Sequence, residues 1–140
     1  MGLDGRKMSK SYDNFIALSE EEQSIRTKTA RMFTDPARIK RNDPGHPDKC
    51  NVHNYYAVFA PERCSEINSL CRQAQIGCTE CKKELAEILI KFLAPIQKKR
   101  KELLLDPGRI LDILEKGKER ARDLASRTIA EVKAALNLPQ

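Results

Sequence analysis

The sequence contains no tryptophan, and phenylalanine and tyrosine together make up only 5% of its 140 residues. No apolar run reaches the length of a membrane span, and no secretory signal is recognisable, so nothing predicts export or insertion into a membrane. A chain of this length forms one domain with a modest core and is too short for two ordinary domains. We therefore expect a cytoplasmic protein.

Segments that alternate between apolar and polar residues are also missing, which argues against β-strands. Helical patterns are plentiful instead, and the region 36–50, rich in proline and glycine, is expected to be irregular. The first expected helix is capped by Ser19 and runs to about Phe33, the second is capped by Asn51 and runs to Phe59, and the third covers 61–75. The fourth is capped by Thr79 and should kink or break at Pro95. The last begins at Pro107, with Asp106 as its cap. The sequence thus predicts an all-α helical bundle over 17–140, preceded by a flexible loop over 1–16.

Acidic side chains are outnumbered, with 20 against 26 lysines and arginines, which gives a net charge of +6. Such an excess indicates a polyanionic partner such as nucleic acid. The densest cluster, Lys98–Lys101, is equally typical of a solvated helix face. The candidate phosphate contacts flank the cysteine segments and are Arg38, Lys40, Arg41 and Arg72.

The stretch GLDGRKMSKSYDN, residues 2–14, has no apolar stripe to bury and surrounds a basic, hydroxyl-rich centre with glycines and acids. Lys7 and Lys10 bracket Met8 and Ser9, and Ser11 follows directly. Two ammonium groups on a loop can bind neighbouring phosphates and stabilise the negative charge on a leaving pyrophosphate. One well-placed donor to such developing charge lowers the activation free energy by about 3–4 kcal/mol. For such a pattern taken alone, an ordinary solvated basic loop is the alternative.

Five cysteines in a chain without an export signal indicate reduced thiols or metal ligands rather than disulfides. Four of them, Cys50, Cys71, Cys78 and Cys81, have the spacing C-x20-C-x6-C-x2-C. The last pair starts a helix, whose N-terminus lowers the pKa of thiols, and four thiolates bind zinc or an iron–sulfur cluster. Cys64 would lie about 10 Å from Cys71 on one helix, so we leave it out of the site. Five reduced, mostly buried thiols are the alternative.

The string KMSKS at 7–11, with Gly2–Gly5 before it and Tyr12–Asn14 after it, closely resembles the loop of class I aminoacyl-tRNA synthetases. The segments 25–28, 31–36, Gly45 and 47–48 resemble the region that follows this loop in bacterial tryptophanyl-tRNA synthetases. The resemblance covers essentially the whole chain. The same region of a tyrosyl-tRNA synthetase is one alternative, and a freestanding nucleic-acid-binding module with iron–sulfur or zinc is another, although it would have no use for the loop.

In this family ATP and Mg²⁺ serve to activate the amino acid, which is then transferred to tRNA. The resemblance implies that Lys7 and Lys10 stabilise the triphosphate and the departing pyrophosphate. It implies that Met8 and Ser9 border the adenosine and that Ser11 assists the phosphates. It also implies tRNA-Trp as the partner of the helical domain, which would read unstacked anticodon bases.

Two parts of the family pattern are missing, namely the H-x-G-H motif and the nucleotide-binding Rossmann core. We therefore expect the chain to be the C-terminal part of the enzyme and to be inactive alone, since ATP and tryptophan would bind through the missing domain. Full enzymes of the family are homodimers, and the sequence leaves open whether this part is monomeric. We expect Gly2–Asn14 to be poorly ordered or unnaturally packed.

A subset of this family carries a [4Fe–4S] cluster on a motif that ends in C-x6-C-x2-C. Cys71, Cys78 and Cys81 match that ending, while the first gap of the subset is two residues longer than the gap after Cys50. The resemblance therefore implies a [4Fe–4S] cluster on these four cysteines, with Zn²⁺ as the alternative.

Overall fold

Helices joined by loops and short turns make up the computed structural model, which describes residues 1–139. The helices are α1 (Glu22–Ala30), α2 (Asn51–Phe59), α3 (Pro61–Arg72), α4 (Cys78–Leu104) and α5 (Pro107–Ala135), and 3₁₀ turns are η1 (Lys10–Tyr12) and η2 (Pro47–Lys49). No strand occurs in residues 1–139, which confirms the all-α fold class. None of the helices in this part of the chain is long and apolar enough to cross a membrane.

The described chain divides into two compact units, one from Met1 to Gln97 and one from Lys98 onward. Residues 1–16 belong to the same unit as α1, α2 and α3. The boundary expected between residues 16 and 17 stays a prediction.

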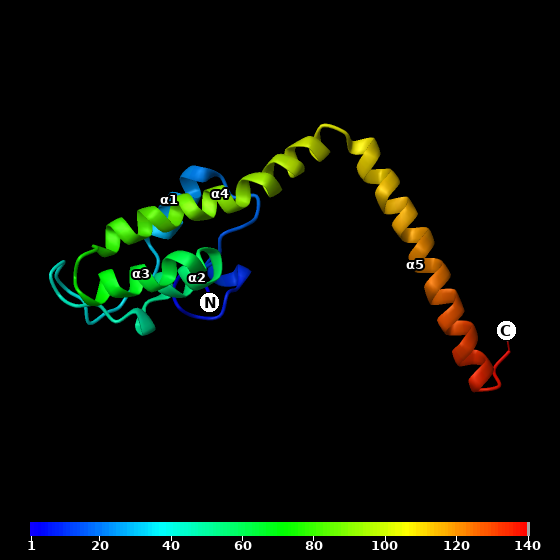
Figure 1. Cartoon of the computed structure of the whole chain (residues 1–140). Coiled ribbons are helices and arrows are strands. Elements are labelled where there is room, and N and C mark those ends of the chain that lie inside the picture. Colours follow the sequence, from blue (N-terminus) through cyan, green and yellow to red (C-terminus); the bar gives the residue numbers. More distant parts are fainter. Residues whose placement is uncertain (140) are drawn as a thin grey trace. The chain divides into compact units, whose positions relative to one another are not determined.

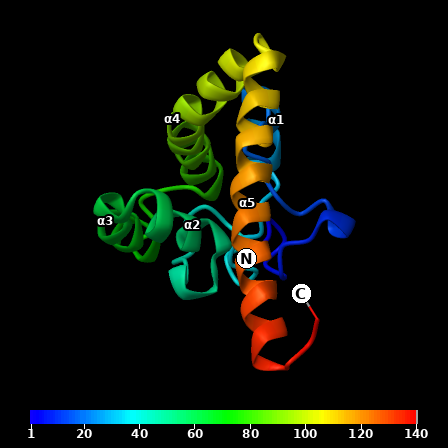
Figure 2. The same cartoon turned by 90° about the vertical axis from the view of Figure 1, so that its right-hand side faces the viewer.

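The core of the first unit forms between its four helices. Ile25 of α1, Tyr56 of α2, Ile67 of α3 and Leu85 of α4 are almost fully buried. Each such apolar side chain removed from water contributes about 1.5–3 kcal/mol. Helices α2 and α3 lie side by side, and the N-terminal segment, drawn in dark blue, lies next to α2 (Figures 1 and 2).

Three helices begin at positions that differ from the expectation. Helix α1 starts at Glu22, and Ser19 makes no cap. The reason lies in Glu20, whose carboxylate accepts hydrogen bonds from the backbone N–H of Ala17 and from the Lys28 ammonium. This network fixes the chain before α1 in place of the expected cap at Ser19.

Helix α4 starts at Cys78, one residue before the expected Thr79 cap, and it continues through Pro95 without a break. Helix α2 contains Asn51 as its first residue, because the Asn51 side chain points back to Gly2 and does not cap the helix. In the second unit the expected cap at Asp106 is confirmed, since its carboxylate accepts from the backbone N–H of Arg109 at 3.1 Å.

Candidate functional site

The loop of residues 2–14 is closed by the side chain of Asn14. Its Nδ2 donates to Asp4 Oδ1 at 2.8 Å and to the carbonyl of Lys7 at 3.1 Å, and its Oδ1 accepts from the backbone N–H of Ser9 at 2.8 Å. Asn14 is 4% exposed, although it stands in a polar loop. One buried amide thus holds three points of the loop together, a role that the sequence reasoning missed.

The loop is also fixed to the helices. Asn51 donates to the carbonyl of Gly2 at 2.7 Å, and the backbone N–H of Phe33 donates to the carbonyl of Leu3 at 2.8 Å. A side chain at Gly2 would overlap the Asn14 amide, so only glycine fits there. The N-terminal end of the loop is thus hydrogen-bonded to the buried Asn51 and to the backbone of Phe33. The expectation that Gly2–Asn14 is poorly ordered or unnaturally packed stays a prediction.

The two lysines of the KMSKS string lie on the outer side of this closed loop. Lys7 and Lys10 are exposed, and Lys10 begins the turn η1. The ion pairs of the loop use other residues, since Arg6 pairs with Asp4 at 2.8 Å and Asp13 with Lys28 at 3.7 Å. Both ammonium groups are therefore available for an anionic ligand.

The residues expected to border the nucleotide differ in their surroundings. Met8 is 49% exposed and lines an apolar groove beside α2, together with Tyr55 and Phe92. Ser9 is half-buried, and its hydroxyl accepts from the backbone N–H of Ser11 at 3.2 Å. The predicted roles of Met8, Ser9 and Ser11 towards ATP stay predictions.

Four thiols from three separate segments meet around one small cavity of about 20 Å³. They belong to the residues expected from the sequence spacing: Cys50, Cys71, Cys78 and Cys81. Cys50 precedes α2, Cys71 lies in the last turn of α3, and the other two open α4. A hollow of this size holds about one water molecule.

Burial governs the ionisation of these thiols. Burial, with smaller contributions from the neighbouring Cys50, Cys71 and Cys78, raises the pKa of Cys81 to about 12. Burial also raises the pKa of Cys71, against the opposing effect of the Arg38 guanidinium. Burial thus opposes the lowering of the thiol pKa that the start of the helix led us to expect for Cys81.

The donor set fits a thiolate-bound metal centre in its chemistry. Four cysteines converging from separate segments match the all-thiolate sites of zinc and of iron–sulfur clusters. Gly45 supports this arrangement, since a Cβ on it would overlap the Cys71 sulfur. As placed in residues 1–139, however, no three histidine, cysteine or acidic side chains stand in metal-binding geometry, so ligation requires the thiols to reorient.

Cys64 lies apart from this cavity, as the helical spacing predicted. Its sulfur is 3.4 Å from Nε2 of His53, in an open hollow that also contains Asn68 and Arg72. Burial lowers the pKa of His53. The neighbouring histidine was not evident from the sequence, because the two residues stand eleven positions apart.

The four basic residues singled out for phosphate contacts have different surroundings. Lys40 and Arg41 are exposed. Arg72 is exposed but donates to both carboxylate oxygens of Asp48 at 3.0 and 3.1 Å. Arg38 is half-buried, and its guanidinium donates to the carbonyls of Arg41 and Ile76. The predicted contacts of the four residues with phosphate stay predictions.

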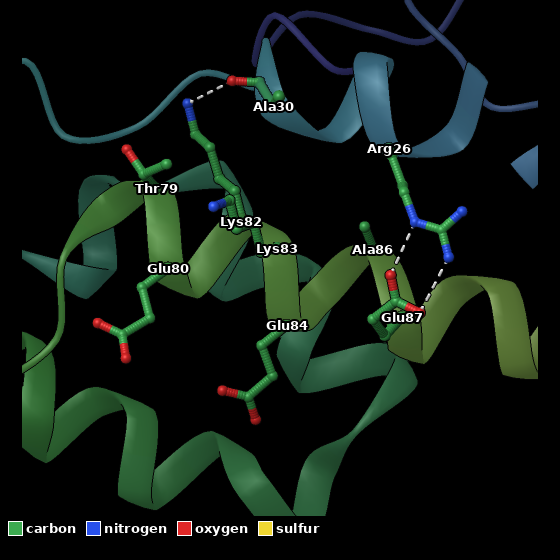
Figure 3. A pocket seen from close by; sticks show the side chains of 9 residues that line it. All are labelled: Arg26, Ala30, Thr79, Glu80, Lys82, Lys83, Glu84, Ala86 and Glu87. Atoms are coloured by element: carbon green, nitrogen blue, oxygen red, sulfur yellow. Dashed lines mark hydrogen bonds and ion pairs between the residues drawn. The ribbon is translucent and has the colours of Figure 1, made fainter. Parts of the chain in front are cut away.

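A wider hollow of about 620 Å³ lies between α1 and the first half of α4 (Figure 3). Its lining mixes charges, because three cations are matched by three glutamates: Arg26, Lys82 and Lys83 against Glu80, Glu84 and Glu87. Arg26 is already held by Glu87, and Lys82 donates to the carbonyl of Ala30. A net charge near zero and engaged donors make this hollow a poor site for phosphate.

The sequence of the chain matches a known family model. The model described as tRNA synthetases class I (W and Y) matches residues 1–94. A tryptophan–tRNA ligase of Aquifex aeolicus is 41% identical over 99% of this chain, and one of Thermotoga maritima is 41% identical over 98%. The chain spans only 35% and 42% of the length of these two relatives.

Solved structures agree with this match. The tryptophanyl-tRNA synthetase of Campylobacter jejuni, complexed with ADP and tryptophan, aligns over 98% of this chain and 43% of its own with a TM-score of 0.82 and 26% identity. The enzyme of Aeropyrum pernix aligns over 72% of this chain and 29% of its own, with a TM-score of 0.64 and 34% identity. The family model covers more than half of the chain, including the KMSKS string and helices α1, α2 and α3, so the chain belongs to the class I tRNA synthetases of the W and Y family.

Proposed function

We propose that this chain is the C-terminal part of a tryptophan–tRNA ligase, where it supplies the ATP-handling loop and the helices that recognise tRNA-Trp. The observation that carries the proposal is the 41% identity to two tryptophan–tRNA ligases over nearly the whole chain. The whole enzyme would activate tryptophan with ATP and Mg²⁺ and transfer it to tRNA. Those steps need the part of the relatives that this chain does not span.

In this proposal Lys7 and Lys10 act on the phosphates of ATP. Both lie exposed on a loop that Asn14 and Asn51 hold in place, so their backbone positions are fixed before a ligand arrives. Donors fixed in advance stabilise developing charge without the cost of reorganisation. Ser9 and Ser11 lie between and beside the lysines, where they can border the same phosphates and the adenosine with Met8.

The helical part would contact tRNA phosphates through Lys40 and Arg41, which are exposed beside the thiol cavity, and through Arg72 once it exchanges Asp48 for a phosphate. Such contacts bind any tRNA in a salt-dependent manner and position the protein on it. Recognition of tRNA-Trp in particular would come from contacts to its anticodon bases.

We further propose that Cys50, Cys71, Cys78 and Cys81 hold a [4Fe–4S] cluster, with Zn²⁺ as the alternative. The support is the convergence of these four thiols, with Cys64 excluded, and the absence of room for a side chain at Gly45. A metal would bind the cysteines as thiolates, so that its binding releases the protons that the buried thiols otherwise keep. The centre would thereby fix Cys50, the residue before α2, relative to α3 and α4.

A hybrid enzyme tests the proposed function. The matching segment of the Thermotoga maritima ligase is replaced by this chain, and tryptophan-dependent exchange of pyrophosphate into ATP is measured. We expect exchange that falls by about 10²–10³ in kcat for Lys10→Ala, as for loss of one donor to developing charge, and stays unchanged for Lys98→Ala. A folded hybrid without exchange, or one that is indifferent to Lys10→Ala, would contradict the proposal.

A further inference from the structure

Arg38 places a permanent positive charge at the thiol cavity. Its Nη1 lies 3.7 Å from the sulfur of Cys71 and 3.9 Å from that of Cys78. Its Nη2 donates to the carbonyls of Arg41 at 2.8 Å and of Ile76 at 2.9 Å. The two carbonyls thus hold the plane of the guanidinium in one orientation, with its other edge against the two sulfurs.

The charge of Arg38 has no carboxylate partner among residues 1–139. The two nearby acids are engaged elsewhere, since Asp35 pairs with His46 and Asp43 accepts from the backbone N–H groups of Ile39 and Lys40. The Nε of Arg38 is buried and has no hydrogen-bond partner. An arginine cannot lose its proton, and a charge taken out of water is costly unless it is paired.

Thiolate ligands of a bound metal would supply the negative charge that the Arg38 guanidinium lacks. Four thiolates around a dication, whether Zn²⁺ or a [4Fe–4S]²⁺ core, carry four negative and two positive charges and leave the centre anionic. Metal centres are tuned by the hydrogen bonds and charges that surround their ligands. The guanidinium of Arg38 is placed to supply both, as N–H donors to Cys71 and Cys78 and as the opposite charge.

We propose that Arg38 is a positioning residue for the thiolate centre: it orients the Cys71 and Cys78 sulfurs and compensates the charge of the bound metal. This inference rests on the proposed centre. It changes the expected role of Arg38 from a contact to tRNA phosphate to a contact to sulfur. A purely structural role, the bridging of two backbone carbonyls, would affect the stability of the fold without affecting metal affinity.

The test uses Co²⁺, which reports thiolate ligation through its absorption spectrum, in a competition titration with a chelator under anaerobic conditions. The chain is compared with Arg38→Gln, Arg38→Lys and the control Lys40→Gln, which removes the same charge from an exposed neighbour. We expect Arg38→Gln to weaken Co²⁺ binding by about 10–100-fold, as for other residues that support metal ligands. Lys40→Gln should bind like the parent chain, and Arg38→Lys should fall between, because it keeps the charge and loses the planar fork.

A second readout is the reduction potential of the reconstituted iron–sulfur form. It should become more negative in Arg38→Gln, since a nearby positive charge and N–H donors favour the reduced cluster.

Binding by Arg38→Gln equal to that of Lys40→Gln would overturn the inference while leaving the metal centre intact. If Arg38→Gln does not fold by circular dichroism, Arg38→Lys decides, and parent-like affinity in that variant overturns the inference. A parent chain that binds no Co²⁺ through thiolate would remove the proposed centre and this inference with it.

Discussion

Asn51 donates a hydrogen bond from Nδ2 to the carbonyl oxygen of Gly2, 2.7 Å away, and both residues are buried. The bond ties the KMSKS-containing loop to the first turn of α2. The preceding residue, Cys50, lines the thiol cavity. Two consecutive residues therefore join the proposed ATP-handling loop to the proposed metal centre.

Replacing Asn51 should destabilise the first unit and release the loop. Asn51→Ala loses a buried hydrogen bond, which costs about 1–3 kcal/mol when its partner is left unsatisfied. Asn51→Asp should cost more at pH 7, since it places a carboxylate beside a carbonyl oxygen, and should recover partly in acid, where the protonated group donates again. Urea unfolding measures both variants, with Asn54→Asp on the exposed side of α2 as the control. Equal stability of Asn51→Asp and Asn54→Asp would contradict the claim that the hydrogen bond from Asn51 to Gly2 holds the loop on α2.

The ionisation of Asp4 should report the closure of the loop. The hydrogen bond from Asn14, followed by that from the Arg6 backbone, lowers the pKa of Asp4 from 3.8 to about 2. Because the folded pKa is lowered, this contribution to stability is present above pH 4 and is lost as the pH falls towards 2. An NMR titration of the Asp4 carboxyl carbon should give the low value in the parent chain and a value nearer 3.8 in Asn14→Ala. A normal pKa in the parent chain would show that the loop is open.

Gly45→Ala should disrupt the thiol cavity, because its Cβ would overlap the sulfur of Cys71. Overpacking of this kind costs about 1–3 kcal/mol. Gly117→Ala is the matched control, since open space surrounds that position in α5 and alanine should stabilise the helix by about 0.5–1 kcal/mol. Unfolding curves and metal content measure both variants, and an unchanged metal content in Gly45→Ala would count against the assigned ligands.

The cysteines should separate into two classes on replacement by serine. Anaerobic reconstitution of the parent chain should give a brown protein with about four irons per chain if the four thiolates hold a cubane cluster. Cys71→Ser should lose most of that iron, while Cys64→Ser should keep it, because Cys64 lies in the separate hollow beside His53. A colourless parent chain that contains only zinc would favour the alternative metal, and equal loss in both variants would contradict the ligand set.

Some features that depend only on neighbouring residues were predictable from the sequence, although the caps expected at Ser19, Asn51 and Thr79 do not form. The cap at Asp106 and the start of α3 at Pro61 follow from local backbone chemistry, and both are confirmed. The distance between Cys64 and Cys71 along one helix also excluded Cys64 from the cavity, because helical geometry fixes that separation.

Features that depend on distant partners were not predictable. Nothing in the sequence around Asn14 and Asn51 marks their side chains as buried, and only the folded chain shows that each is buried and hydrogen-bonded to the loop. Arg38 stands in a basic segment typical of a phosphate contact, yet its guanidinium binds carbonyls and approaches sulfurs. Burial of the thiols likewise opposes the pKa shift expected for Cys81 at the start of a helix.

An equilibrium titration of this chain with tRNA-Trp, tRNA-Tyr and a tRNA-Trp with an altered anticodon tests the central claim most directly. We expect tRNA-Trp to bind most tightly, and Lys40→Gln with Arg41→Gln to weaken all three and to lower the salt dependence by about one unit of slope per residue. Equal affinity of the parent chain for the three RNAs would contradict the proposal that this chain recognises tRNA-Trp.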